Sequence, residues 1–96
     1  MKVVIKRSPK HDKKLVAIFY DQYGVKTKTT HFGAKGMSDY TIHKDPIRKE
    51  RYIERHKNRE NWNDYFSAGA LSRWILWNKS SLTPSIADYK RRFNLK

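Results

Sequence analysis

The stretch Ser67-Ala-Gly-Ala-Leu-Ser-Arg-Trp-Ile-Leu-Trp-Asn78 decides the fold, because as a helix it would be apolar on most of its sides. At about 100° per residue, Leu71, Trp74 and Ile75 share one face, with Trp77 beside them and Leu76 nearly opposite. A helix that is apolar all round belongs in the interior of a domain. We therefore expect residues 68–78 to form the central helix, with a partner-binding surface as the alternative. The small residues at its start leave room for another backbone to approach.

The 96 residues are enough for one domain with one modest core, and no repeat or low-complexity segment divides them. Hydrophobic residues make up only 38% of the chain, but 14% are aromatic, so a few large side chains must carry the packing. The sequence predicts a single α+β domain over residues 1–96. Its expected core consists of Phe19, Tyr52, Ile53, Trp62, Leu71, Trp74, Ile75, Trp77, Ile86, Tyr89 and Phe93.

Three strands are expected over about residues 2–32. Residues 2–7 are rich in β-branched side chains, and residues 14–20 are apolar on both alternating faces, which predicts a covered central strand. Asp21-Gln-Tyr-Gly24 is typical of a hairpin turn. The return strand over residues 25–32 places Lys26 and Lys28 on one solvent-exposed face. We expect an antiparallel meander with the middle strand at its centre.

Three helices follow a connector over residues 33–45, from which Tyr40 and Ile42 are expected to pack inward. Asp45 as N-cap and Pro46 at the first helical position predict a helix over about residues 46–58. The aromatic loop after it should fold back onto the core, with an exposed stacking surface as the alternative. The central helix over about residues 68–78 comes next, and Thr83-Pro84 predicts a last helix over about residues 84–93. Only the chain ends are expected to be loose.

The charge of the chain is strongly unbalanced, with 22 Lys and Arg against 9 Asp and Glu and a formal net charge of +13. Such an excess favours an anionic partner: a nucleic acid, an anionic membrane surface or an acidic protein face. The alternative is a basic surface that serves only solubility.

Four arginines on or next to the helix over residues 46–58 fall within about 80° of one another around its axis. Like charges one turn apart are mildly destabilising unless an anion lies over them. Arginine is also the better bidentate ligand for carboxylate and phosphate groups. We interpret them as an anion-binding ridge, with a solvated face as the alternative. The candidate binding residues are Arg48, Arg51, Arg55 and Arg59, together with Lys26, Lys28 and Lys35 from the expected sheet and turn.

No catalytic or metal-binding pattern is recognisable. The four histidines do not pair at a metal-ligand spacing, no cysteine is present, and Gly33-x-x-Gly36 lacks the features of a phosphate loop. His56 and Asn61 are similar to part of a His/Asn nuclease site, but the expected order of elements does not supply its ββα context. We interpret His56 as a hydrogen-bonded core histidine. The sequence predicts no catalytic residue, no metal and no cofactor.

The compartment is suggested only indirectly. No apolar run approaches the roughly 20 residues of a membrane span, and the first seven residues have too short an apolar core for a signal peptide. The absence of cysteine fits a reducing environment. We expect a protein of the cell interior, or one enclosed in a particle assembled there.

Four stretches together resemble a family of small basic proteins of large nucleocytoplasmic DNA viruses that infect algae and protists. They are Phe32–Asp45, Arg48–His56, Glu60–Trp62 and Ser67–Lys79, and the resemblance extends over about residues 14–93. It implies a virus-encoded protein and carries no catalytic residue over to this chain. Proteins of this kind commonly lie in the particle, either under the capsid shell or on the packaged genome.

Two functions are therefore expected. The first is a virion structural protein, a minor capsid or core-associated protein that bridges larger viral components through its positive surface. Its partners would be capsid or core proteins, and it would assemble inside the host cell. The second is a DNA- or RNA-binding protein that contacts phosphates without reading sequence.

Overall fold

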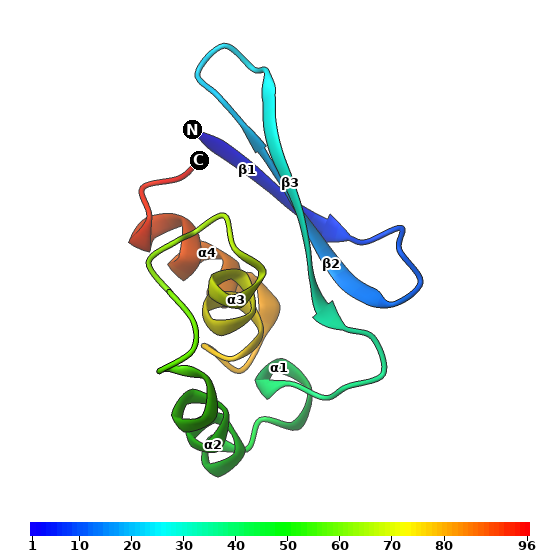
Figure 1. The fold of residues 1–96 in the computed structure, drawn as a ribbon, viewed down its shortest axis with the longest axis vertical. Helices are drawn as coiled ribbons and strands as arrows, with labels where there is room; N and C mark the ends of the chain where they lie inside the picture. The colour runs from blue at the N-terminus through cyan, green and yellow to red at the C-terminus, as the bar shows by residue number, and fades with distance from the viewer.

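The computed structural model describes residues 1–96 and begins with a three-stranded antiparallel sheet (Figure 1). The strands β1 (Lys2–Arg7), β2 (Lys13–Tyr20) and β3 (Lys26–Ala34) lie in the order β1-β2-β3, so the middle strand is central. Asp21 closes the second hairpin by accepting hydrogen bonds from the amides of Tyr23 and Val25. The α+β class and the meander are confirmed.

A bulge in β2–β3 changes which face each lysine of β3 occupies. Lys28 pairs with Phe19 but Lys26 pairs with Tyr20, because the register shifts between these two β2 residues. Paired residues project from the same face of a sheet, and neighbours along a strand project from opposite faces. Lys26 and Lys28 therefore lie on opposite faces, and the prediction that they share one face is wrong.

The connector contains one helical turn, α1 (Tyr40–His43), which Asp39 caps by accepting a hydrogen bond from the amide of Thr41. Tyr40 is half-buried, but Ile42 is 61% exposed, so the inward packing predicted for Ile42 is wrong. On this single turn Ile42 falls on the side that faces solvent.

The first long helix, α2 (Pro46–His56), begins where Asp45 and Pro46 predict. The Asp45 carboxylate accepts from the amides of Ile47 and Arg48. The helix ends at His56, two residues before the expected boundary, and residues 57–59 form a turn.

The central helix changes its winding halfway along. It starts as α3 (Ala68–Leu71) and continues as the π-helix η1 (Ser72–Leu76), in which the amide of Trp77 donates to the carbonyl of Ser72 at 3.0 Å. In a π-helix the hydrogen bond spans five residues, so side chains five apart come onto similar sides. Leu71 and Leu76 consequently both enter the core, although uniform α-helical spacing places them on nearly opposite faces.

The last helix, α4 (Leu82–Arg92), begins two residues earlier than expected. Ser81 occupies the N-cap position without a capping hydrogen bond from its side chain, and Thr83 lies inside the first turn. Beyond the helix, Leu95 is only 8% exposed and the amide of Lys96 donates to the carbonyl of Met1, so the expected looseness of the ends is wrong.

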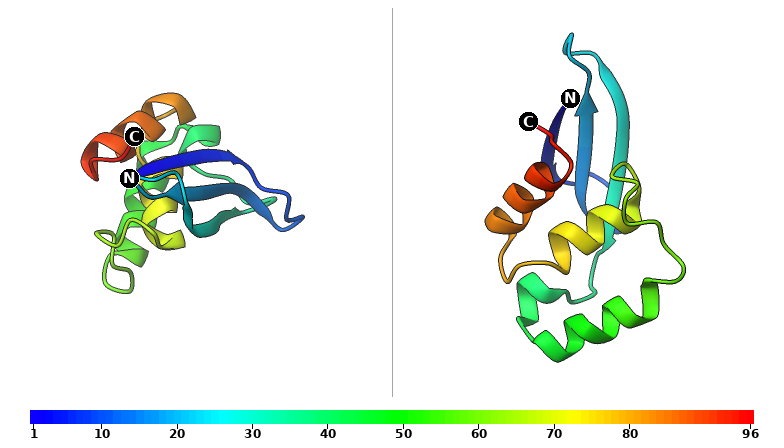
Figure 2. Two further views of the ribbon diagram at one scale, coloured as in Figure 1. Left: turned by 90° about the horizontal axis from the view of Figure 1, so that it is seen from above. Right: turned by 90° about the vertical axis from the view of Figure 1, so that its left-hand side faces the viewer.

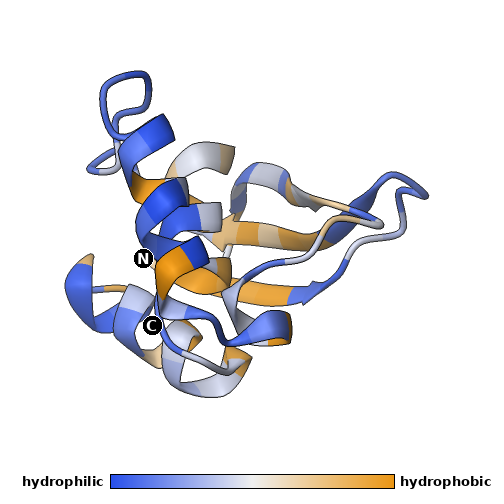
Figure 3. Ribbon diagram, turned by 90° about the horizontal axis from the view of Figure 1, so that it is seen from below, coloured by the Kyte–Doolittle hydropathy of each residue, from blue (hydrophilic) through white to orange (hydrophobic).

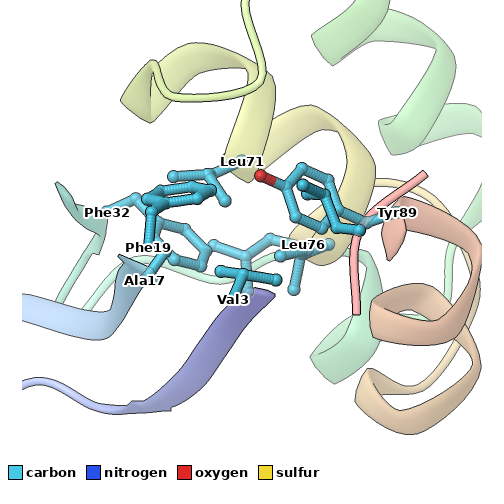
Figure 4. Packing of buried hydrophobic residues seen from close by; sticks show 9 residues of the cluster. Val3, Ala17, Phe19, Phe32, Leu71, Leu76 and Tyr89 are labelled. Atoms are coloured by element: carbon cyan, nitrogen blue, oxygen red, sulfur yellow. The ribbon is translucent and has the colours of Figure 1, made fainter. Parts of the chain in front are cut away.

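The central helix and α4 pack on one face of the sheet, and the core lies between them and the strands (Figures 1, 2 and 4). The helix α2 lies beyond the sheet and packs on the central helix through Tyr52 and Trp77. The loop after α2 folds back as predicted, because the Phe66 ring lies 4.7 Å from that of Phe19 and the Tyr89 hydroxyl donates to the carbonyl of Tyr65. Of the predicted core, Phe19, Tyr52, Leu71, Ile75 and Tyr89 are buried, and Ile53, Trp62, Trp74, Trp77, Ile86 and Phe93 are half-buried.

The second face of the sheet carries no helix. Hydrophobic residues run along the strands while the connecting turns are hydrophilic (Figure 3). Val16 and Ile18 alternate with the core residues Ala17 and Phe19, so they project from this second face. Both are nevertheless buried, with Val16 2% and Ile18 9% exposed, so the prediction of a covered central strand is confirmed on both faces although no helix packs on this one. No helix in the structure is both long and apolar enough to cross a bilayer.

Candidate anion-binding surface

The arginine ridge lies along the solvent side of α2. Burial of Tyr52 turns this helix towards the core and leaves Arg48, Arg51 and Arg55 exposed. Arg59 lies past the end of the helix, in the following turn, where its Nε donates to the carbonyl of Arg55 at 3.2 Å. The ridge therefore consists of three helical arginines and one that is held by the backbone beyond them.

No carboxylate neutralises the ridge. None of the five ion pairs in the structure includes Arg48, Arg51, Arg55 or Arg59. Glu54 pairs instead with Lys57 at 3.1 Å, and Glu60 with His56 at 3.2 Å. Unpaired guanidinium groups on one side of a helix can donate bidentate hydrogen bonds to carboxylate or phosphate oxygens.

The two predicted lysines of β3 do not join this ridge. Lys26 and Lys28 lie at the start of β3, near the hairpin tip, and α2 lies at the opposite end of a molecule that is 42 Å long (Figure 1). Lys35 lies in the turn that follows β3. All three are exposed, but the structure distributes the candidates over separate regions instead of one continuous surface.

A second group of cations surrounds the end of η1, and sequence reasoning missed it. The Arg73 guanidinium lies 5.4 Å from the Trp62 ring centroid and 4.3 Å from that of Trp74. The Arg92 guanidinium also lies over Trp74, at 3.7 Å from its ring centroid. Arg73 donates to the carbonyl of Trp77 at 2.8 Å, and the Lys49 ammonium donates to that of Asn78 at 2.7 Å. These cations stabilise the carboxyl end of the central helix and join α2 to it.

Burial lowers the pKa of both Arg73 and Lys49. The charge of Arg92 lowers the pKa of Arg73 further, and the charge of Arg73 does the same for Lys49. The Nε of Arg73 is buried without a hydrogen-bond partner. The sequence signal for this group was Arg73, a single arginine inside an otherwise apolar helix. A buried guanidinium needs hydrogen-bond acceptors or aromatic rings around it, so its position predicts such partners nearby.

A cleft of about 390 Å³ separates the end of β3 from α2 and α3. Along it three rings stack: Trp77 on Tyr52 at 4.3 Å, and Tyr52 on His56 at 4.3 Å. Glu60 accepts a hydrogen bond from Trp62 Nε1 and lies 3.2 Å from His56 Nδ1. His56 is hydrogen-bonded as predicted, but it lies half-exposed at the rim instead of inside the core.

The groups in this cleft are engaged in holding the structure. The Glu60 carboxylate lies against Gly69, where a β-carbon would come within 3.0 Å of it, so the space expected for a neighbouring backbone holds a side chain. Burial raises the pKa of the Tyr52 hydroxyl, which keeps it neutral at physiological pH. No three His, Cys, Asp or Glu side chains gather as a metal site requires.

Comparison with known proteins gives one family. Residues 3–56 match a family of unknown function, DUF5754, over the sheet, the connector and α2. No curated protein and no solved structure matches the chain.

Proposed function

We propose that this chain, which belongs to the DUF5754 family, is a small structural protein of a virion that bridges larger anionic components. The observation that carries the proposal is the presence of free positive charge at both ends of the molecule. The arginine ridge on α2 occupies one end of the molecule, and the lysines at the start of β3 occupy the other.

The carboxylates of the chain support this proposal because most of them serve local structure. Asp39, Asp45 and Asp64 accept hydrogen bonds from backbone amides near helix starts, and Asp21 does so in a turn. Only four of the 22 Lys and Arg side chains form an ion pair with a carboxylate. Arg73 and Lys49 are partly buried and bonded to backbone carbonyls, but most of the remaining cations are exposed. A body with free cations at both ends can hold two anionic surfaces together.

The viral setting of the proposal rests on the sequence resemblance described above. A minor capsid or core-associated protein would meet acidic faces of capsid proteins on one side and further components on the other. Such a role needs no catalytic group, metal or cofactor.

Quantitative mass spectrometry of purified particles of the encoding virus tests this role. We expect the protein at a copy number in simple ratio to the capsid proteins. Absence from the particles, or trace copies unrelated to capsid symmetry, would contradict the proposal.

A second candidate function is binding of duplex DNA or RNA through the arginine ridge, which the lack of any acidic partner for Arg51 and Arg55 favours. Binding of random duplex DNA should weaken steeply with salt, because phosphate contacts release counterions. The double variant Arg51→Glu/Arg55→Glu should lose most of this binding. The matched control is Lys6→Glu/Lys26→Glu, which changes the charge equally but away from α2 and should retain duplex binding. Failure to bind duplex DNA at about 50 mM salt would exclude this candidate.

A further inference from the structure

We call the face of the sheet that carries no helix the outer face. Val4 and Lys6 of β1 pair with Ile18 and Val16 of β2, and Val16 pairs with His31 of β3. These side chains alternate with those of the core, so they project away from the helices.

The outer face is hollowed along β2. One hollow, of about 440 Å³, lies between Lys6, Ile18 and His31. The other, of about 570 Å³, lies between Lys2, Val4 and Tyr20 towards the hairpin tip. The two hollows adjoin, because Val4 lines one and its partner Ile18 on the next strand lines the other. We call the two hollows together the groove. Its apolar floor is closely packed, since Val16 is only 2% and Ile18 only 9% exposed, so the half-buried Val4, Tyr20 and His31 present most of its surface.

The rim of this groove is cationic. Lys2, Lys6, Arg7 and Lys26 border it and are exposed, and none of them belongs to an ion pair. No acidic residue lines the hollow between β1 and β3. The only acid at the other hollow is Asp21, whose carboxylate already accepts from two backbone amides of the turn.

Two rings lie in the groove where they can offer a flat surface. Tyr20 pairs with Lys2 and Lys26 on either side and is half-buried. His31 is held by a hydrogen bond of 2.8 Å between its Nδ1 and the Ser8 hydroxyl. An apolar floor with aromatic rings and a cationic border matches the two parts of an unpaired nucleotide, a base and a phosphate.

We propose that the outer face binds single-stranded nucleic acid without reading its sequence. The bases would lie over Tyr20, His31 and the floor between them, and the phosphates would lie along Lys2, Lys6 and Lys26. A duplex hides the faces of its bases in the stack and would leave the apolar floor unused. A second copy of the chain would bring the same uniformly positive border against itself, which like charge opposes. This inference does not depend on the bridging role and concerns a different surface from α2.

Fluorescence anisotropy with a labelled oligothymidylate tests the proposal on the full chain. Lys6→Glu/Lys26→Glu should weaken binding at least about tenfold, and Tyr20→Ala should weaken it about fivefold or more, as loss of one stacked base does. Arg51→Glu/Arg55→Glu carries the same change of charge on α2 and should weaken oligothymidylate binding clearly less than the outer-face double variant does. Thermal melting by circular dichroism confirms that each variant is folded.

Several outcomes would overturn the proposal. Equal loss in the outer-face and α2 variants would show that net charge alone attracts the oligonucleotide. Unchanged binding by both outer-face variants, or no binding by the wild-type protein at low salt, would place the strand elsewhere or exclude it. Tighter binding of a polyglutamate peptide would identify an acidic protein segment as the occupant, and burial of the face in a dimer in solution would identify a second copy. None of these results bears on the presence of the protein in particles, so this inference and the bridging role can fail separately.

Discussion

Gly33 shows at the scale of one residue how the sheet meets the central helix. It has a left-handed φ of 79°, and a β-carbon there would come within 2.8 Å of Leu76 Cδ1 and 3.3 Å of Lys14 Cβ. Leu76 is itself only 3% exposed and has little room to move. Glycine at this position therefore serves two purposes, the backbone conformation and the close contact.

The variant Gly33→Ala should lower the free energy of unfolding by about 2–4 kcal/mol, because the energetic cost of the strained backbone adds to that of the overpacked contact. Gly36→Ala is the matched control, since Gly36 has a φ of 88° but nothing within 4 Å of its added β-carbon. Gly36→Ala should lower the free energy of unfolding by only about 1–2 kcal/mol, from backbone strain alone. Denaturant unfolding measures both values, and equal losses in the two variants would contradict the contact with Leu76.

Asp88 makes stability depend on acid. Burial raises the pKa of its carboxyl, but the hydrogen bond from Asn78 and the charges of Arg92 and Lys79 outweigh burial, so the pKa is lowered overall. A carboxyl whose pKa is lower in the folded state stabilises the fold above its ordinary value of about 3.9, and that contribution is lost as the pH falls through the folded pKa.

We therefore expect Asp88→Asn to be less stable than the wild-type protein at pH 7, by about 1–2 kcal/mol. The difference should shrink as the pH is lowered from about 4 to about 2. Thermal melts at a series of pH values measure it. A difference that stays constant or widens in acid would contradict the role of this carboxylate.

At the scale of the element, α2 has fewer buried residues than any other helix except the single turn α1. Tyr52 is its only buried residue, and the helix is held chiefly by the stack of this ring on Trp77 and by the Lys49 ammonium on the Asn78 carbonyl. The sequence predicted the start of α2 correctly because capping is local. The sequence could not place the stack, because Tyr52 and Trp77 meet only through tertiary packing.

The variant Trp77→Ala should release α2 before the sheet. Loss of a half-buried tryptophan should cost about 2–3 kcal/mol, and the amides of α2 should exchange with solvent deuterium much faster than those of β2. Tyr23→Ala is the control, because that ring is 80% exposed. Its removal should change neither the free energy of unfolding nor the exchange rate of the α2 amides. Equal acceleration of exchange in β2 and α2 would mean that Trp77 supports the whole core instead.

At the scale of the whole molecule, the net charge of +13 acts on stability as well as on binding. Unpaired cations repel one another in the compact state, and salt screens them over about 10 Å at 0.1 M. The same screening weakens contacts with an anionic partner. Stability and binding should therefore respond to salt in opposite directions.

Raising the salt from about 20 mM to about 200 mM should increase the melting temperature by a few degrees, on the order of 5 °C for about 1 kcal/mol. The variant Arg51→Glu/Arg55→Glu lowers the net charge to +9, since each reversal removes two charges, and should show a smaller increase. Scanning fluorimetry measures both. A melting temperature that falls with salt would show that attractive pairs outweigh the repulsion.

The sequence by itself determined the α+β class, the order of the strands and the N-cap of α2, since these depend on local pattern and hydrophobicity. Of the nine residues in the buried cluster it predicted only Phe19, Leu71, Ile75 and Tyr89. It also identified the arginines of the ridge, which the matched family region includes up to Arg55. The tertiary structure alone decided which cations lie together, because a one-residue bulge separates Lys26 from Lys28 and chain topology carries α2 to the far end. It likewise decided the course of Ser67–Asn78, where π-helical winding from Ser72 to Leu76 turns Leu76 inward. Register and winding depend on packing against distant residues, and uniform periodicity along one chain does not contain that information.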